Sequence, residues 1–228
     1  MKTLIFDNDG VLRDESKSYE RCVIETVNFF SGAPATKEEI MSSRAASNND
    51  YERTLHILIK RNVFSADQKE KILEDKIIPK FQELYLGKKG DFSGYINNEP
   101  WLADNYLLAM LKGHNSMAIV SGAPKEEIMY TLRKNKADGL FSLILGMYDC
   151  NGKQDGIKRA MNHFKSDNAY FCDDRPAPIK AALELGNVTS YGILPPQAEP
   201  EWGKILKDAG AEKVFKDVND YCRFLIDQ

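Results

Sequence analysis

Short apolar runs that alternate with amphipathic stretches limit what this chain can fold into more than any other feature of its sequence. The apolar runs occupy residues 3–6, 117–120, 143–146, 169–172 and 191–194. A short run that is apolar throughout is typical of a parallel strand covered on both faces. Amphipathic stretches separate the later runs, at 125–135, 155–164, 178–186 and 201–210. This order predicts a doubly wound α/β sheet, which a strand at 213–215 and a helix at 218–226 would close.

Residues 15–100 interrupt this alternation and show a helical pattern throughout. The apolar residues of the first part recur at the spacing of one helix face, namely Tyr19, Cys22, Val23, Val27 and Phe30. Thr36 and Glu39 have the spacing of a capping box at the start of the next helix. We therefore expect an α/β core domain formed by residues 1–14 and 101–228, and an all-helical domain, residues 15–100, inserted after the first strand.

Charge and composition exclude several classes of function. The formal net charge is −3 at pH 7, whereas a nucleic-acid-binding protein usually carries a basic surplus. No apolar stretch approaches the roughly 20 residues that a membrane-spanning helix needs. The first residues, MKTLIF, run into an acidic cluster, which is not the pattern of a signal peptide. The four cysteines lack zinc-site spacing, and we expect Cys22 and Cys172 to be reduced core residues of a cytoplasmic protein.

Polar residues follow four of the predicted strands. The first strand is followed by Asp7, Asn8 and Asp9, the second by Ser121 and Gly122, the third by Lys153 after a short loop, and the fourth by Asp173 and Asp174. In an open α/β sheet, ligands bind beyond the carboxyl ends of the strands, where these groups would meet. A cluster of carboxylates is unstable without a cation, and oxygen ligands in this number suit Mg²⁺ together with a substrate phosphate.

At these positions the sequence resembles the haloacid dehalogenase superfamily. DNDGVL at 7–12 is similar to the first motif of that family, the serine of IVSG to its second, the lysine of GKQDGI to its third, and FCDDRPAPIKAALELG to its fourth. The four motifs occur in the family's order. The helical stretch after the first motif resembles the cap of the branch (subfamily IA) that contains phosphoglycolate phosphatases and β-phosphoglucomutases. The resemblance implies a Rossmann-like core and a mobile helical cap.

The resemblance also implies the chemistry, which is phosphoryl transfer through a phosphorylated aspartate. It implies Asp7 as the nucleophile and Asp9 as the group that protonates the leaving oxygen and then activates water. Ser121, Gly122 and Lys153 would bind the phosphoryl oxygens. The implied ligands of Mg²⁺ are Asp7, Asp174, Asp173 and the backbone carbonyl of Asp9.

The sequence departs from the family pattern at three places. Asn8 stands where the family usually has an apolar residue, Asp173 stands where it often has Gly or Glu, and no proline follows Lys153. The last departure leaves Lys158, on the following helix, as an alternative for the lysine of the third motif. Asp9 argues against a dehalogenase, which lacks this second acid and needs no Mg²⁺.

The loop at 43–54 is the candidate for substrate recognition, because a cap loop reaches over the active site in capped members of the family. Arg44, Asn48, Asn49 and Asp50 would contact the substrate. Two amides and a carboxylate suit the hydroxyl groups of a sugar or polyol phosphate. In a purely structural interpretation, Asp50 is the N-cap of a helix over 51–61 and the asparagines form a turn. The sequence leaves both interpretations open.

We therefore expect a cytoplasmic, Mg²⁺-dependent phosphatase that acts on a small sugar, polyol or glycolate-type phosphate. A phosphomutase of the β-phosphoglucomutase type is an alternative, because the exclusion of water depends on how the cap fits. An alternative of another class is a catalytically silent binding or regulatory protein, which the filled catalytic positions argue against. We expect neither nucleic acid nor membrane as a partner, and a monomer or weak dimer; the sequence does not determine the physiological substrate.

Overall fold

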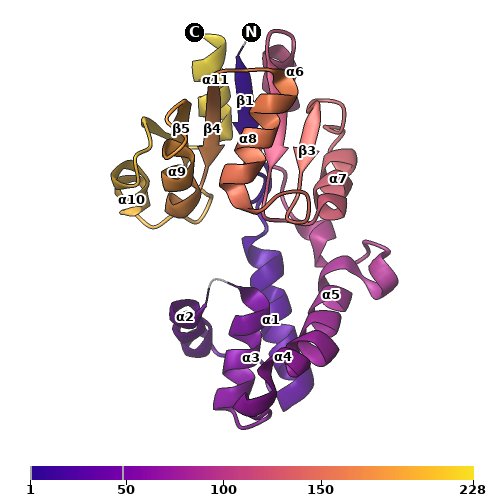
Figure 1. Cartoon of the computed structure of the whole chain (residues 1–228). Helices are drawn as coiled ribbons and strands as arrows, with labels where there is room; N and C mark the ends of the chain where they lie inside the picture. The colour runs from indigo at the N-terminus through magenta and orange to yellow at the C-terminus, as the bar shows by residue number, and fades with distance from the viewer. Residues whose placement is uncertain (1, 48) are drawn as a thin grey trace. The chain divides into compact units, whose positions relative to one another are not determined.

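The computed structural model describes residues 2–47 and 49–228 of the chain. The chain separates into two compact units (Figure 1). The first, called the core unit here, contains the residues up to Asp14 together with Pro100–Gln228, and the second, the helical unit, is Glu15–Glu99. That the helical unit works as a cap over an active site stays a prediction.

The core unit is built on a six-stranded sheet with the strand order β3-β2-β1-β4-β5-β6. Its strands are β1 (Thr3–Phe6), β2 (Ser116–Val120), β3 (Leu143–Leu145), β4 (Ala169–Asp173), β5 (Val188–Ile193) and β6 (Lys213–Phe215). All pairs are parallel, and Phe6 at the end of β1 is level with Ile119 on β2 and with Cys172 on β4. The predicted doubly wound α/β sheet is confirmed, although β5 begins at Val188 and not at 191.

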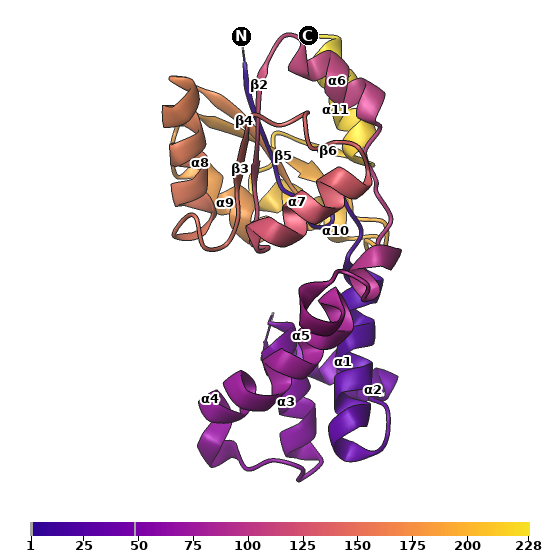
Figure 2. The same cartoon turned by 90° about the vertical axis from the view of Figure 1, so that its right-hand side faces the viewer.

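Helices cover both faces of the sheet, as the edge-on view in Figure 2 shows. One face carries α8 (Gly152–Phe164) and α9 (Pro176–Leu183), and the other carries α6 (Asn105–Lys112), α7 (Lys125–Lys134) and α11 (Val218–Ile226). A further helix, α10 (Trp202–Asp208), packs against α9. On β1, Leu4 and Phe6 belong to the core under α6, α7 and α11, whereas Ile5 belongs to the core under α8 and α9. All three are fully buried, which explains why residues 4–6 of this strand are apolar on both faces of the sheet.

The helical unit contains α1 (Ser16–Ser31), α2 (Lys37–Ala46), α3 (Asp50–Lys60), α4 (Lys69–Ile72) and α5 (Ile78–Leu86). A π-helical turn, Leu73–Ile77, joins α4 to α5, and short 3₁₀ segments lie at Ala66–Gln68, Lys88–Gly90 and Tyr95–Asn98. Helix α1 packs against α3 and α5. Cys22, Val23 and Val27 on α1 are fully buried, as the helical spacing predicted. Thr36 and Glu39 form the predicted capping box at the start of α2.

The structure also bears on the cysteines and on membrane insertion. All four cysteines are free thiols, and Cys22 and Cys172 are buried as predicted. Within the described stretches, 2–47 and 49–228, no helix combines the length and the apolar character needed to cross a membrane.

Candidate active site

The loop after β1 turns sharply and carries the two acids of the first motif. Asp7 continues the strand ladder, since its N–H donates a hydrogen bond to the carbonyl of Cys172 at 3.0 Å, and the residue is only 5% exposed. The turn passes through Gly10, which has a φ of 73°. A Cβ atom at Gly10 would lie 2.3 Å from Oδ2 of Asp174. Glycine is therefore required here both for the backbone conformation and for the close approach of Asp174.

The second pair of acids stands at the end of β4, the strand that pairs with β1. Asp173 and Asp174 are both buried. Carboxylate oxygens of Asp7, Asp173 and Asp174 lie within 4.8 Å of one another. The backbone N–H of Arg175 donates a hydrogen bond to Oδ1 of Asp173 at 2.9 Å. Three of the residues predicted as metal ligands are thus brought together by two neighbouring strand ends.

Lys153 joins these carboxylates from the first turn of α8. Its Nζ lies 2.6 Å from Oδ1 of Asp7 and donates hydrogen bonds to Oδ2 of Asp173 at 2.8 Å and to the carbonyl of Val120 at 2.9 Å. Helix α8 begins at Gly152 and not at 155 as predicted, so that Lys153 belongs to the helix. Lys158, the alternative, is exposed. Of the two lysines, the fold brings Lys153 to the acidic cluster.

Ser121 and Gly122 follow β2, on the other side of β1. Ser121 is 3% exposed; its N–H donates to the carbonyl of Leu145 at 3.0 Å, and its Oγ accepts a hydrogen bond from the N–H of Ala123 at 3.1 Å. The residue before it, Val120, supplies the carbonyl that Lys153 contacts. Gly122 is exposed, and the space where a Cβ would lie is open. Their role in binding a phosphoryl group stays a prediction.

Burial and charge change the pKa values of this cluster. Burial, followed by the charge of Asp173, raises the pKa of Asp7 to about 7. Burial alone would lower the pKa of Lys153, but the carboxylates of Asp173 and Asp7 outweigh it and raise that pKa. A fully ionised cluster of Asp7, Asp173, Asp174 and Lys153 has more negative than positive charge. An excess of buried negative charge favours the binding of a cation.

The donor set fits a hard divalent cation. Asp7, Asp173 and Asp174 each offer a buried carboxylate oxygen within the same small volume. Carboxylates are the protein ligands that Mg²⁺ prefers, and Mg²⁺ usually keeps water molecules and a substrate phosphate as its other ligands. The cluster therefore suits a metal ion of this class.

Asp9 has surroundings different from those of Asp7. Its Oδ1 accepts hydrogen bonds from Nε of Arg13 at 2.6 Å and from Nδ2 of Asn8 at 2.7 Å. Burial alone would raise the pKa of Asp9, but the charge and hydrogen bond of Arg13, together with Asn8, lower it below the ordinary value. Asp7 and Asp9 therefore differ in their electrostatic surroundings, although only Asn8 separates them along the chain.

The residues predicted to recognise the substrate belong to the helical unit. Arg44, on α2, is exposed, and its Nη2 lies 2.7 Å from Oε2 of Glu20 on α1. Asn48 lies outside the described residues. Contact between the substrate and the loop at 43–54 stays a prediction.

The start of α3 differs from the structural interpretation of this loop by one residue. Asn49, and not Asp50, is the N-cap: its Oδ1 accepts hydrogen bonds from the N–H groups of Tyr51 at 2.9 Å and Glu52 at 3.3 Å. Asp50 is the first residue of the helix, and its carboxylate pairs with the guanidinium of Arg53. The Asn49 side chain satisfies two backbone donors that the first turn of a helix leaves unpaired, which decides the position of the cap.

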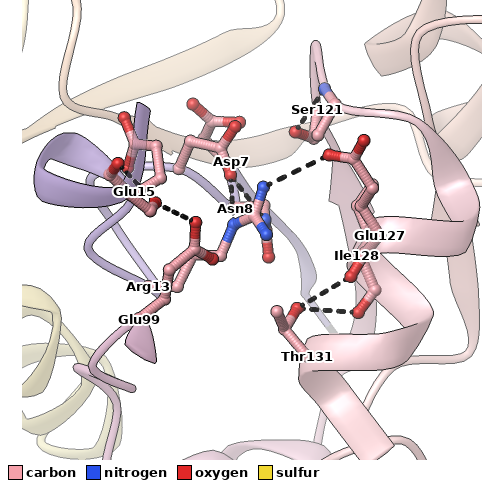
Figure 3. Close-up of polar contacts among 12 residues, drawn as sticks. Asp7, Asn8, Arg13, Glu15, Glu99, Ser121, Glu127, Ile128 and Thr131 are labelled. Carbon is pink, nitrogen blue, oxygen red and sulfur yellow. Dashed lines mark hydrogen bonds and ion pairs between the residues drawn. The ribbon is translucent and has the colours of Figure 1, made fainter. Parts of the chain in front are cut away.

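Two residues near the site, Arg13 and Glu127, were not among the candidates from the sequence. Nη2 of Arg13 lies 3.9 Å from Oε2 of Glu127, and both side chains are buried (Figure 3). The sequence contained an indication of the role of Arg13. This charged residue directly follows the apolar Val11 and Leu12 and stands four residues after Asp9. Glu127 gave no signal, since an acid in the first turn of a helix is common.

Several solved structures with this fold are described as phosphatases or as a β-phosphoglucomutase. A predicted phosphoglycolate phosphatase from Haemophilus somnus has 16% sequence identity and a TM-score of 0.74, over 99% of this chain and 98% of that chain. A phosphatase from Thermococcus thioreducens has 17% identity and a TM-score of 0.70, over 99% of each chain. A chain assigned as a β-phosphoglucomutase from Thermotoga maritima has 18% identity and a TM-score of 0.69, over 100% and 99%. At these identities the likeness shows the fold.

A comparison of sequences adds a curated relative and a family. An imidazoleglycerol-phosphate dehydratase from Phytophthora nicotianae is 28% identical over 232 residues, which is 94% of this chain and 50% of the relative. This chain thus spans about half the length of the curated relative that it matches. The model of the family described as haloacid dehalogenase-like hydrolase matches residues 4–190. Because that span carries all four motifs and the acidic cluster, the chain belongs to the haloacid dehalogenase-like hydrolases.

Proposed function

We propose that this protein is a Mg²⁺-dependent phosphatase that hydrolyses a small phosphorylated metabolite through a phosphorylated Asp7. The contact of Lys153 with both Asp7 and Asp173 carries the proposal. It places a buried carboxylate, an ammonium group and further carboxylates at one point on the sheet edge. A carboxylate nucleophile beside fixed positive charge is the arrangement that phosphoryl transfer through an acyl phosphate requires.

In the first step, an oxygen of Asp7 would attack the phosphorus atom of the substrate. The bond between phosphorus and the leaving oxygen would break, and Asp9 would give that oxygen a proton. Lys153, with Ser121 and Gly122, would bind the phosphoryl oxygens and offset their charge. Mg²⁺ would be held by the side chains of Asp7, Asp173 and Asp174 and by the carbonyl of Asp9. Its charge would offset the repulsion between Asp7 and the incoming phosphate.

In the second step, water would attack the phosphorus atom of phosphorylated Asp7. Asp9, now a carboxylate, would accept a proton from that water molecule. The bond between phosphorus and the Asp7 oxygen would break, and its electron pair would restore the Asp7 carboxylate. Inorganic phosphate would leave, and one water molecule would have been consumed for each ester hydrolysed.

The helical unit would act as a cap that selects the substrate, with Arg44, Asn49 and Asp50 as candidate contacts. The substrates to be tested are sugar, polyol and glycolate-type phosphates. Phosphate esters that carry an imidazole ring belong in the same screen, because the curated relative is named for such a compound. We place the protein in the cytoplasm, where buried free thiols stay reduced, as a monomer or weak dimer.

Hydrolysis of p-nitrophenyl phosphate, measured with Mg²⁺ and with EDTA, tests the proposal. We expect turnover that requires the metal and that Asp7→Asn abolishes. Failure of the folded protein to turn over any phosphate ester in the screen and to trap beryllofluoride on Asp7 would refute it. A phosphomutase would instead form phosphorylated Asp7 that resists water and passes its phosphoryl group to a sugar phosphate.

A further inference from the structure

Arg13 is the largest of the fully buried side chains among the described residues, with 1% of its surface exposed. A guanidinium group cannot lose its protons in a protein, so it carries its charge into the interior. Burial of an isolated charge costs several kcal/mol unless anionic partners and hydrogen bonds compensate. The burial of Arg13 in the loop after β1 therefore requires compensating partners.

Two carboxylates of the core unit contact this guanidinium. On one side, Nε lies 2.6 Å from Oδ1 of Asp9. On the other side, Nη2 lies 3.9 Å from Oε2 of Glu127, which is 3% exposed in the first turn of α7. Figure 3 shows the guanidinium reaching from the loop after β1 toward Glu127. Glu127 thus lies, on a separate element, within ion-pair distance of the cation that contacts Asp9.

The backbone of the loop fixes the position from which Arg13 reaches Asp9. The N–H of Gly10 donates to the carbonyl of Arg13 at 2.8 Å, and the N–H of Arg13 donates to the carbonyl of Asn8 at 3.1 Å. The two residues of the ion pair, Asp9 and Arg13, also form a β-bridge. The closed turn therefore fixes the backbone positions of both residues of the ion pair, which lowers the conformational cost of forming the contact.

The two oxygens of Asp9 have different partners. Oδ1 accepts hydrogen bonds from both Arg13 and Asn8. No side chain in 2–47 or 49–228 donates a hydrogen bond to Oδ2. A carboxylate oxygen with two charge-assisted or amide donors is oriented by them, and the other oxygen is left to exchange a proton.

We propose that Arg13, supported by Glu127, is a positioning residue that orients Asp9 so that Oδ2 accepts the proton of the attacking water when phosphorylated Asp7 is hydrolysed. This inference rests on the function proposed above. In the step concerned, the water oxygen bonds to phosphorus, its proton passes to Oδ2, and the Asp7–phosphorus bond breaks. Arg13 itself exchanges no proton and touches no reacting atom.

The test compares the two half-reactions in Arg13→Met with p-nitrophenyl phosphate as the substrate. Nitrophenolate is a weak base and needs little protonation as it leaves, so transfer to Asp7, which kcat/KM reports, should change little. Hydrolysis of the phosphorylated Asp7 needs the base, and kcat should fall by about 100-fold. KM should fall with kcat, and phosphorylated Asp7 should accumulate, as seen by mass spectrometry after an acid quench.

A second variant keeps the test decisive if Arg13→Met fails to fold, and a third variant serves as the control. Glu127→Gln keeps the shape of the side chain and removes the charge that supports Arg13, and it should show the same split between kcat and kcat/KM with a smaller loss of kcat. Arg223→Met removes an exposed arginine that pairs with Asp220 on α11, and it should show neither change.

Several outcomes would overturn the inference. One is a parallel loss of kcat and kcat/KM without phosphorylated protein, which would mean that Arg13 only supports the fold. Another is no change in a folded Arg13→Met or Glu127→Gln. A wild type that forms no phosphorylated Asp7 and traps no beryllofluoride would refute the proposed function and this inference together. A working wild type with no split in the variants would refute this inference alone.

Discussion

Nζ of Lys153 lies 2.6 Å from Oδ1 of Asp7, although the two residues belong to the two separate segments of sequence that form the core unit. Lys153 stands in the first turn of α8 and Asp7 follows β1. The same ammonium contacts Asp173 after β4. A phosphoryl group transferred to Asp7 would therefore lie beside a fixed positive charge, which would offset the negative charge on its oxygens.

Replacing Lys153 by Met should lower kcat/KM for p-nitrophenyl phosphate by about 100-fold, because loss of one charge-stabilising donor from a transition state costs about that much. Lys158→Met is the matched control, since Lys158 lies on the same helix and is exposed. It should leave kcat/KM nearly unchanged. An equal loss of kcat/KM in the two variants would show that the contacts of Lys153 with Asp7 and Asp173 have no specific role in catalysis.

The effect of Mg²⁺ on thermal stability should show whether Asp174 is a metal ligand. Mg²⁺ at about 100 times its Kd should stabilise the folded wild type by about 2.7 kcal/mol, measured as a rise in Tm over the protein in EDTA. Asp174→Asn should lose most of this rise. Asp208→Asn, an exposed acid on α10, should keep it. A rise of the same size in Asp174→Asn would contradict the assignment of this ligand.

Gly10 and Gly32 form a matched pair that tests the close approach of Asp174 to the loop after β1. Both have a positive φ, of 73° and 76°, but a Cβ at Gly10 would meet Asp174 whereas the space at Gly32 is open. Each change to Ala should cost about 1 kcal/mol of unfolding free energy for the backbone conformation. Only Gly10→Ala should also abolish the Mg²⁺-dependent rise in Tm and the turnover. Retention of both by a folded Gly10→Ala would contradict the described geometry.

Glu39 should make the stability of the helical unit depend on pH. Arg61 donates hydrogen bonds to Oε1 of Glu39 at 2.7 Å and to Oε2 at 2.6 Å, and these bonds lower the pKa of Glu39. Because the folded pKa lies below the unfolded one, the stabilisation is complete above the ordinary value of about 4.3 and is lost as the pH falls through the folded pKa.

Glu39→Gln should therefore lower the free energy of unfolding by about 1 kcal/mol at neutral pH. The difference from wild type should shrink in acid, below about pH 4. Urea unfolding followed by circular dichroism at both pH values measures it, with Glu70→Gln, an exposed acid on α4, as the control. A difference that stays constant with pH would show that the pair contributes nothing through its charge.

Particular residues show how far the sequence could predict the site. Asp7, Asp173 and Asp174 were predicted to meet because the carboxyl ends of neighbouring parallel strands share one edge, and they do lie together. The N-cap of α3 was placed one residue late, at Asp50, because Asn49 and Asp50 are both good caps and only the backbone geometry distinguishes them. Helix α8 begins earlier than its apolar pattern, since the periodicity of apolar residues does not mark the first turn.

The sequence by itself determined the α/β sheet, the helical insertion and the acids at the strand ends. These follow from apolar periodicity and from short motifs, which are local properties of the chain. Only the tertiary structure decided that Lys153 and not Lys158 reaches the acids, and that Arg13 lies between Asp9 and Glu127. Such contacts depend on how side chains from separate elements pack, and no spacing along the sequence encodes the distance between a loop after β1 and the first turn of α7.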